Sequence, residues 1–472
     1  MKIALIYPPV LNSIKTTLPD FVNENEGYFP PLGIMYIASY LKAYQRDCEV
    51  LIIDSVAEKL DHGQIAARVA DFKAEIVGIS CWTFSLIDAL ATARQIKKSS
   101  PCISVCLGGP HVNIYPRETL FNDCVDFVIT EDGERAFSEL ISQMHPGGNL
   151  QSVPNLYYKR FGKIMRSGLS YAEKELDVLP YPDRRLTDIN KYSSIMDNEG
   201  LITTMITSRG CPFNCSFCFQ RASGWRSRSV SNIVGEMKEC IKIGISNFFI
   251  FDETFTVSKK RIMELCLEIK RNKLDIIWSC RSRVDTIDEE VMDNLKDSGC
   301  KRISFGVEAA STQVLRRLNK QITIKRASEI FRLAKRKGII TLADFMVGCP
   351  DERWQQTKQT IRLAKKLNPD FVQFSLFTLF PATKLYEEAL KEGVIESDVW
   401  HNYAVNPRAD FKPPLWNLYT EKQANRILVM AYQKFYLRFS YILKCLSSIT
   451  SLNKLKVYAR AALSLLRTAV KE

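Results

Sequence analysis

The sequence of 472 residues lacks a long apolar run. A membrane-spanning helix needs about 20 predominantly apolar residues. The longest candidate, from Phe371 to Phe380, is shorter and is interrupted by Gln373, Ser375 and Thr378. No membrane span is therefore predicted.

Secretion is not expected either, because the apolar run at the N-terminus is short and is broken by Pro8 and Pro9. The 14 cysteines are scattered through this large chain and do not form a compact disulfide framework. We therefore expect reduced thiols in a cytoplasmic compartment. Most of them are expected to be packing residues, such as Cys240 and Cys266 on the apolar stripes of predicted helices.

The positive charge is unevenly distributed. The chain has a net charge of +13, and residues 421–472 hold ten Lys or Arg against two Glu. No nucleic-acid motif accompanies this tail, so a nucleic-acid partner is not expected. Its aromatic and cationic residues favour a helical cap on the preceding domain, with contact to an anionic membrane surface or a phosphorylated substrate as the alternative.

Residues 1–150 alternate β-rich runs with helical stretches, which predicts an α/β domain with a doubly wound, Rossmann-like parallel sheet. The predicted strands are Ile3–Tyr7, Cys48–Asp54, Ile76–Ser80, Ser104–Leu107 and Phe127–Thr130. Ligands of such sheets bind beyond the carboxyl ends of the strands. The first strand is followed by Pro8 and Pro9 and lacks the glycine fingerprint of dinucleotide sites, which disfavours NAD and FAD.

A second α/β series follows a proline-containing segment, residues 151–194, that we interpret as a linker. Its predicted strands are Ile202–Ser208, Asn247–Glu253, Ile276–Arg283, Lys301–Glu308, Ile340–Gly348 and Asp370–Phe380. This alternation over residues 195–400 predicts a (β/α)6 partial barrel with its site at the carboxyl ends of the strands. Residues 401–472 are expected to form a basic, helical C-terminal segment.

Three cysteines, Cys211, Cys215 and Cys218, follow the first barrel strand within eight residues. Their spacing could mark one helical face, but an intervening glycine, proline and asparagine indicate a loop. Thiolates are soft ligands that suit iron–sulfur clusters, and a cubane held by three of them keeps one iron open. Zinc is the competing metal, although no fourth Cys or His follows at a usual finger spacing.

This Cys-x3-Cys-x2-Cys motif after a barrel strand closely resembles the signature of the radical S-adenosylmethionine superfamily. The resemblance implies that Cys211, Cys215 and Cys218 hold a [4Fe-4S] cluster. The open iron would bind the amino and carboxylate groups of S-adenosylmethionine. An electron from an external donor of the flavodoxin or ferredoxin type would then break the sulfonium C–S bond and yield a 5'-deoxyadenosyl radical.

The resemblance also implies cofactor contacts elsewhere in the barrel. Phe217 occupies the aromatic position that covers the adenine in family members, and Gly348 lies in the adenine-side turn after the fifth strand. Glu308 matches the polar residue at the ribose, and Lys320 matches a cation for the carboxylate. Hydroxyls need an acceptor and a carboxylate needs a cation, so these assignments are chemically coherent.

Three further barrel residues are candidates for the same cofactor. Asp252 and Glu253 resemble the acidic motif that receives the amino group at the end of the second strand. Arg283 is a candidate contact from the third strand. The alternatives are surface or helix-facing carboxylates for the acidic residues, Glu308 among them, and an exposed position on the barrel rim for Arg283.

The loops of the first domain resemble those of the cobalamin-binding class of radical S-adenosylmethionine enzymes. The residues that carry this likeness are Ser80, Thr83, Gly108, Gly109, Pro110, His111, Glu131, Gly133 and Glu134. Glycines let the backbone approach a flat corrin face, although tight turns alone also select them. The Asp-x-His-x-x-Gly motif of classical cobalamin modules is absent, so the lower cobalt ligand is unassigned. We expect a hydrogen-bonding or structural role for His111, with cobalt ligation as the alternative.

Together the two cofactors imply radical C-methylation of an unactivated carbon in a lipid or natural-product substrate. The same architecture serves oxidation, cyclisation and rearrangement, as in the anaerobic magnesium-protoporphyrin cyclase. A methylthiotransferase acting on RNA would need a second three-cysteine set in the first domain, which the spacing of its cysteines does not provide. A cobalamin or redox sensor would need a closed cluster.

Overall fold

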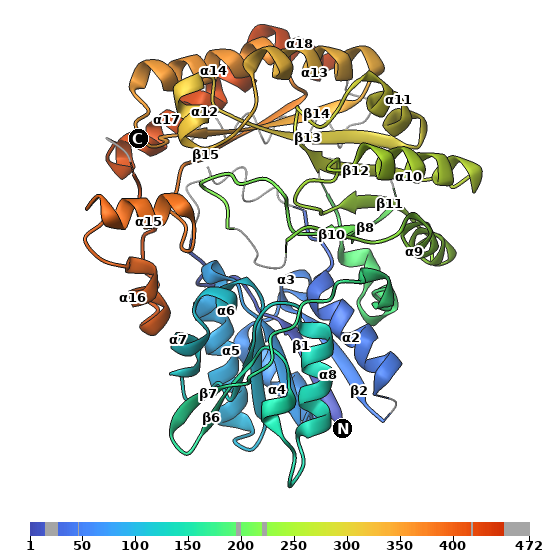
Figure 1. The fold of residues 1–472 in the computed structure, drawn as a ribbon, viewed down its shortest axis with the longest axis vertical. Coiled ribbons are helices and arrows are strands. Elements are labelled where there is room, and N and C mark those ends of the chain that lie inside the picture. The colour runs from blue at the N-terminus through green and yellow to red at the C-terminus, as the bar shows by residue number, and fades with distance from the viewer. Residues whose placement is uncertain (15–26, 46, 195–199, 220–223, 417–418, 448–472) are drawn as a thin grey trace.

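The computed structural model describes residues 1–472 except 15–26, 46, 195–199, 220–223, 417–418 and 448–472. The chain forms two α/β halves, one above the other, with the first sheet in the lower half and the second sheet in the upper half (Figure 1). The predicted fold class is confirmed in both halves.

The first sheet has five parallel strands in the order β2-β1-β3-β4-β5. They are β1 Lys2–Tyr7, β2 Glu49–Asp54, β3 Ile76–Ser80, β4 Ser104–Gly108 and β5 Phe127–Ile129. Helices cover both faces because both faces of the strands are apolar. Helices α2 (Leu32–Tyr44) and α8 (Gly133–Gln143) pack on one face, and α4 (His62–Phe72) and α5 (Leu86–Ser99) pack on the other. Three short helices follow two of the strands: α3 (Ser55–Glu58) comes after β2, and α6 (Pro110–Ile114) and α7 (Pro116–Leu120) come after β4.

Residues 151–194, interpreted above as a linker, contain two strands. β6 (Leu156–Arg160) and β7 (Lys163–Arg166) extend the first sheet antiparallel to β5. Leu156 and Tyr158 alternate into the core of the first half, and Gly162 takes a positive φ in the turn between the strands. These strands have four or five residues each, too short a stretch for their alternation to stand out beside the prolines.

The second sheet has the six parallel strands that the sequence predicts, and their order is β15-β14-β13-β12-β11-β8. They are β8 Leu201–Met205, β11 Ile245–Ile250, β12 Ile277–Ser282, β13 Cys300–Glu308, β14 Ile340–Val347 and β15 Phe371–Leu376. The connecting helices are α9 Val230–Lys242, α10 Lys259–Arg271, α11 Glu289–Asp297, α12 Thr312–Arg317, α13 Ile324–Lys337 and α14 Trp354–Leu367. Most of them begin at a Ser, Thr or Asp whose side chain accepts from a backbone N–H of the first turn, as Ser229 does for α9.

The C-terminal segment caps the barrel. Helices α15 (Lys384–Lys391) and α16 (Val399–Val405) flank the two halves, and α17 (Glu421–Tyr436) covers the edge strand β15. The Tyr432 hydroxyl accepts from the Phe374 N–H (3.1 Å) and donates to the Phe374 carbonyl (3.0 Å). Tyr436 makes the same pair of bonds with Val372, both at 2.9 Å. Two tyrosines one helical turn apart therefore take the place of a neighbouring strand.

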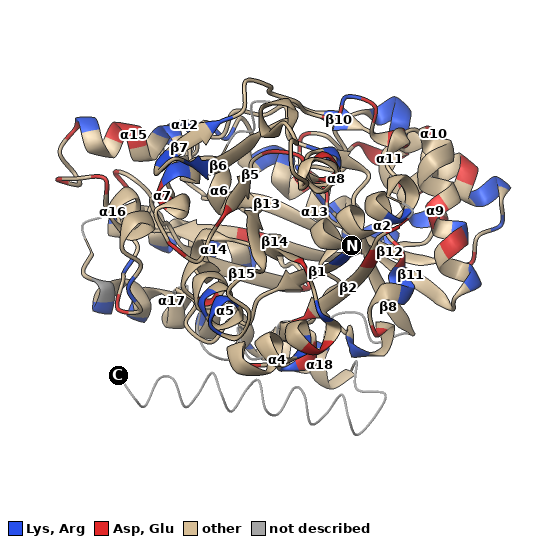
Figure 2. Ribbon diagram, turned by 90° about the horizontal axis from the view of Figure 1, so that it is seen from below, with Lys and Arg blue, Asp and Glu red and all other residues tan. Residues whose placement is uncertain are grey.

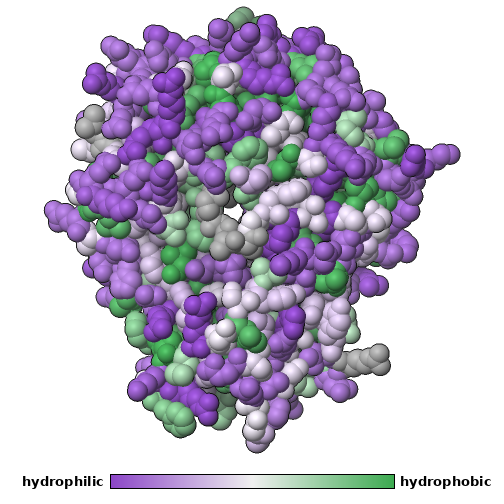
Figure 3. Space-filling view, viewed as in Figure 1, coloured by the Kyte–Doolittle hydropathy of each residue, from purple (hydrophilic) through white to green (hydrophobic). Residues whose placement is uncertain are grey.

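On the outer helices of the described part of the chain, Lys and Arg are interspersed with Asp and Glu (Figure 2). Helix α18 (Phe439–Ser447) ends the described part of the tail, and five of the ten Lys and Arg residues of the predicted basic segment fall outside the described residues. Of the helices that the structure describes, none has both the length and the apolarity that a membrane crossing requires. The molecule is hollowed between its two halves, where hydrophobic side chains reach the surface (Figure 3).

Candidate functional site

The three cysteines lie on a loop whose base is closed by a two-stranded ladder. β9 (Ser208–Arg209) pairs antiparallel with β10 (Arg226–Ser227), so Arg209 faces Arg226 across the base. Gly210 follows with φ +81°, and a Cβ there would lie 2.1 Å from the Gly224 carbonyl oxygen. Only glycine fits this close approach. The described part of this loop, residues 210–219 and 224–225, is called the cysteine loop here, and the ladder holds it in the space between the two halves (Figure 1).

The cysteines are free thiols of different exposure: Cys211 is half-buried, Cys215 is buried and Cys218 is exposed. Cys211 Sγ lies 3.6 Å from Thr254 Oγ1, and Arg283 donates from Nη1 to Cys215 Sγ at 3.7 Å. Within the described part of the chain, no three His, Cys, Asp or Glu side chains converge on one point as they stand. The donor set nevertheless fits a [4Fe-4S] cluster, because it offers three free thiols on one loop and hydrogen-bond donors to two sulfurs.

Backbone contacts hold the cysteine loop against the barrel. The Ser216 N–H donates to the Leu318 carbonyl, and the Leu385 N–H donates to the Ser216 carbonyl, both at 3.0 Å. The Asn319 side chain donates to the Asn214 carbonyl at 2.6 Å. The Cys218 N–H donates to the Cys215 carbonyl at 3.1 Å, which forms a turn and not a helix. The loop prediction is therefore confirmed.

Glu308 and Lys320 form a buried ion pair at the carboxyl end of β13, with Nζ 2.8 Å from Oε1. Glu308 has φ +67°, and the β13–β14 register shifts between Gly306 and Glu308. A Cβ on Gly306 would lie 2.4 Å from Glu308 Oε1 and 2.9 Å from Lys320 Nζ, so a side chain at this position would displace the ion pair. Burial lowers the pKa of Lys320, but Glu308 outweighs it and raises the pKa above its usual value. The predicted ribose and carboxylate contacts thus lie together, and those roles stay predictions.

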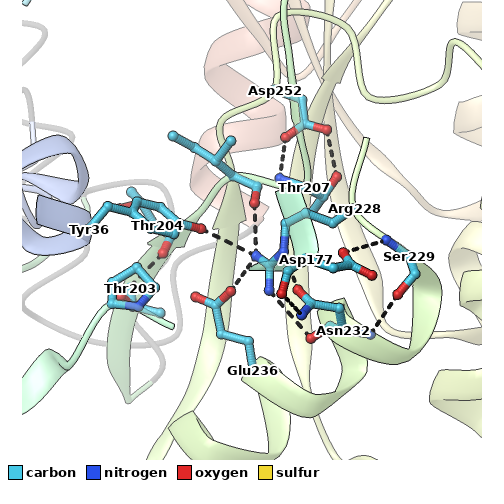
Figure 4. Close-up of polar contacts among 12 residues, drawn as sticks. Tyr36, Asp177, Thr203, Thr204, Thr207, Arg228, Ser229, Asn232, Glu236 and Asp252 are labelled. Carbon is cyan, nitrogen blue, oxygen red and sulfur yellow. Dashed lines mark hydrogen bonds and ion pairs between the residues drawn. The ribbon is translucent and has the colours of Figure 1, made fainter. Parts of the chain in front are cut away.

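Asp252 and Glu253, predicted together, occupy different environments. Asp252 is fully buried and accepts from the Thr207 N–H (2.7 Å) and the Thr207 hydroxyl (2.5 Å; Figure 4). It also accepts from the Ser208 hydroxyl (2.6 Å). Its carboxylate therefore holds the chain where it enters β9. Glu253 is exposed at the same strand end. Of the two, Glu253 is the one whose side chain is open to a ligand amino group.

The other barrel candidates surround the cysteine loop. Phe217 is half-buried against the core. Arg283 is buried and lies over the Phe213 ring at 3.9 Å, so it does not occupy an exposed rim position. The Gly348 N–H donates to the buried Glu352 carboxylate at 2.7 Å, which shapes the turn after β14.

The loop after β5 contacts the base of the cysteine loop through buried ion pairs. Asp132 lies 2.9 Å from Arg209 and 2.6 Å from Arg226. Glu134, predicted as a cobalamin contact, accepts from both terminal nitrogens of Arg209. Burial raises the pKa of Asp132, but Arg209 and Arg226 outweigh it and hold the pKa below its usual value. We call Asp132, Glu134, Arg209 and Arg226 the interdomain ion-pair cluster.

A second buried network connects the same two halves through other elements (Figure 4). Glu236 of α9 pairs with Arg184 and Arg228, and Arg228 also donates to the Tyr36 hydroxyl (3.3 Å) of α2. Burial raises the pKa of the Glu236 carboxyl, but the two arginines outweigh it and hold the pKa below its usual value. Arg184, from the segment before β8, and Arg228 therefore meet at the Glu236 carboxylate, and Arg228 connects this pair to the first half through Tyr36.

The turn that follows β4 in the first half suits a flat ring-shaped ligand. Gly109 has φ +110°, and a Cβ there would lie 2.9 Å from the Cys81 carbonyl oxygen, so the backbone is in close contact with the turn after β3. Val10, Leu11 and Trp82 follow β1 and β3 with exposed fractions of 51%, 63% and 48%. Exposed apolar side chains beside a glycine turn suit an apolar ring system such as a corrin.

His111 is completely buried beneath this turn. Its Nδ1 lies 3.2 Å from Thr83 Oγ1, and its Nε2 has no partner within the described ranges. Burial lowers the pKa of His111 to about 3, so the imidazole is neutral at physiological pH. This environment agrees with a structural role.

The remaining predicted positions in the first half line its carboxyl edge. Ser80 ends β3 and Gly108 ends β4, while Pro110 begins α6 and Gly133 begins α8. Glu131 has φ +58° and donates its N–H to Asn113 Oδ1 at 2.7 Å.

Sequence reasoning missed the interdomain residues Asp132, Arg209, Arg226 and Arg228. Arg209 lies two positions before Cys211, and its nearness to the motif was the available signal. Nothing local indicated its partners, because they lie about 75 residues away in the other half.

Comparison with known proteins agrees with this geometry. Residues 205–364 match the radical SAM superfamily model and residues 20–141 match the B12 binding domain model. An uncharacterised methyltransferase of Pyrococcus horikoshii, PH0819, is 34% identical over 94% of each chain. The anaerobic magnesium-protoporphyrin IX monomethyl ester cyclase of Rubrivivax gelatinosus is 29% identical over 77% of this chain and 67% of that protein.

Among solved structures, the cobalamin-dependent S-adenosylmethionine radical enzyme OxsB, with aqua-cobalamin and S-adenosylmethionine bound, has the same fold. The TM-score is 0.74 at 16% identity, over 98% of this chain and 72% of that chain.

Proposed function

This chain belongs to the cobalamin-binding radical S-adenosylmethionine family, and from that membership we propose that it methylates an unactivated carbon of a lipid or natural-product substrate. When bound, the cluster and S-adenosylmethionine supply a carbon-centred radical and cobalamin supplies a transferable methyl group. The methyltransferase name of the Pyrococcus relative, 34% identical over nearly its full length, supports methyl transfer.

The observation that carries the proposal is the contact between the cysteine loop and the first half. Arg209 stands two residues before Cys211 and is ion-paired with both Asp132 and Glu134, which follow β5. The carboxyl edge of the first sheet is where a doubly wound domain holds its ligand. The ion pairs therefore bring the edge proposed for cobalamin to the loop proposed for the cluster.

The chain's own residues would bind and orient the cofactors. Arg283 and Thr254 would hold the sulfurs of Cys215 and Cys211. The Lys320 ammonium and the Glu308 carboxylate, now paired with each other, would exchange partners for a ligand carboxylate and hydroxyl. Glu253 would receive the ligand amino group.

Radical cyclisation without methyl transfer is the second candidate, and the Rubrivivax cyclase supports it. Both candidates need an electron, for which we propose a donor of the flavodoxin or ferredoxin type. We also propose a cytoplasmic location, with the basic tail as the segment that would contact an anionic membrane surface.

The test is product analysis under anaerobic conditions. The reconstituted protein would receive S-adenosylmethionine with a deuterated methyl group, a reductant and cell extracts as the source of substrate. Methylation predicts 5'-deoxyadenosine, S-adenosylhomocysteine and a product that carries the deuterated methyl group. Full turnover without S-adenosylhomocysteine would contradict methylation and favour the cyclisation candidate.

A further inference from the structure

An exposed arginine stands on the inner face of the barrel sheet. Along β12, Trp278 and Cys280 are fully buried against the outer helices, so Ser279 and Arg281 alternate onto the inner face. Arg281 is exposed although β11 and β13 flank its strand on both sides. Its guanidinium has no hydrogen-bond or ion-pair partner among the residues that the structure describes.

Aromatic rings support this guanidinium. Its central carbon lies 4.9 Å from the centre of the Phe251 ring and 5.8 Å from that of Phe249. Phe29, from the first half, packs on both rings at 5.5 and 5.7 Å. Stacking on rings orients an arginine without neutralising its charge.

A second arginine contacts the same group of aromatic rings. Arg302 on β13 is buried, lies 5.4 Å from the centre of the Phe249 ring and donates to Ser279 Oγ at 3.4 Å. Two guanidinium groups therefore flank one phenyl ring.

An acidic residue on this inner face, Asp344, offsets the positive charge of Arg281 only in part. Asp344 on β14 lies opposite Gly306 and Gln373 and interacts with Arg281 without forming an ion pair. Burial, and then Glu308, raises the pKa of Asp344 to about 7. Its negative charge at neutral pH is therefore weaker than that of an ordinary aspartate.

We propose that Arg281 binds an oxyanion of the substrate, a carboxylate or a phosphate, whose adjoining apolar part packs on Phe249 and Phe251. This inference rests on the proposed function, since it places the substrate inside the barrel. A guanidinium group presents two parallel N–H donors in one plane, and this geometry suits both a carboxylate and a phosphate. Arg283, two residues on and about 7 Å along the strand, donates to Cys215 Sγ. A substrate held by Arg281 would thus lie beside the cysteine loop.

The test is a binding titration of the anaerobically reconstituted full chain, followed by fluorine NMR. The probes are 4-fluorobenzoate and 4-fluorophenyl phosphate, with neutral 4-fluorobenzamide for comparison. We expect at least one anion to bind saturably and more tightly than the amide, and the preferred anion identifies the oxyanion class. Arg281→Gln should weaken that binding about tenfold or more, because it removes a charge-assisted hydrogen bond to the anion. Arg281→Lys should retain part of it.

The matched control is Arg271→Gln, which removes an exposed arginine paired with Glu268 on α10 and should leave binding unchanged. Equal binding of the anions to wild-type protein and Arg281→Gln, or no preference of the wild-type protein for either anion over the amide, would overturn the inference. Wild-type 5'-deoxyadenosine formation without any probe tests the proposed function separately. If the probes do not bind while S-adenosylmethionine is still cleaved, only the assignment of Arg281 is contradicted.

Discussion

At the scale of single residues, the neighbouring carboxylates of Asp252 and Glu253 have different roles because their side chains point in different directions. Asp252 satisfies three donors at the entry to β9, whereas Glu253 is open to solvent. A buried donor that loses its acceptor is costly, whereas an exposed carboxylate contributes little to stability. The two residues should therefore separate stability from ligand binding.

Replacing Asp252 with alanine should lower the free energy of unfolding by about 2–4 kcal/mol, since it leaves the Thr207 and Ser208 donors unpaired. Glu253→Gln should leave stability within about 0.5 kcal/mol and weaken S-adenosylmethionine binding. Chemical denaturation and calorimetric titration measure the two effects. Equal destabilisation by both substitutions would contradict the structural role of Asp252 and the ligand-binding role of Glu253.

His111 should make stability pH-dependent, because burial depresses its pKa from 6.5 to about 3. Below pH 6.5 the unfolded chain binds a proton at His111, whereas the folded chain keeps the imidazole neutral. The contribution of His111 to the free energy of unfolding is therefore fully present above pH 6.5 and is lost as the pH falls towards 3. Between pH 6 and pH 5 wild-type protein should lose up to about 1.4 kcal/mol per pH unit more than His111→Leu. Parallel stability curves for the two proteins would argue against a buried neutral imidazole.

At the scale of elements, the short β9–β10 ladder joins the cysteine loop to the first half. Arg209 and Arg226 oppose each other across it and share Asp132. Removing one partner of a buried ion pair leaves an uncompensated buried charge, which is far more damaging than loss of an exposed pair. The interdomain ion-pair cluster should accordingly fix the loop.

Arg209→Gln should destabilise the protein by about 3–5 kcal/mol and increase amide hydrogen exchange over residues 206–228. The control is Arg135→Gln, which breaks the exposed Arg135–Glu139 pair on α8 and should cost about 0–1 kcal/mol. Hydrogen-exchange mass spectrometry compares the two variants. Unchanged exchange in the loop of Arg209→Gln would show that the ion pairs do not hold it.

At the scale of the whole molecule, the two sheets were predictable because their strands are apolar runs set between amphipathic helices, a pattern that is local in sequence. The cysteine loop was predictable for the same reason, since Cys211, Cys215 and Cys218 lie within eight residues. The pairing of Glu134 with Arg209 was not, because it joins the two halves of the fold. The separation of Asp252 from Glu253 depends on side-chain direction past the end of β11, and the β6–β7 pair was too short to recognise beside the prolines.

The central claim is that the three cysteines hold the cluster that cleaves S-adenosylmethionine. Its most direct test is 5'-deoxyadenosine formation, together with iron content, in anaerobically reconstituted Cys215→Ala beside Cys102→Ala, which removes an exposed thiol of the first half. We expect Cys215→Ala to lose cluster iron and all 5'-deoxyadenosine formation, and Cys102→Ala to match the wild-type protein. Persistent 5'-deoxyadenosine formation by Cys215→Ala would contradict the account.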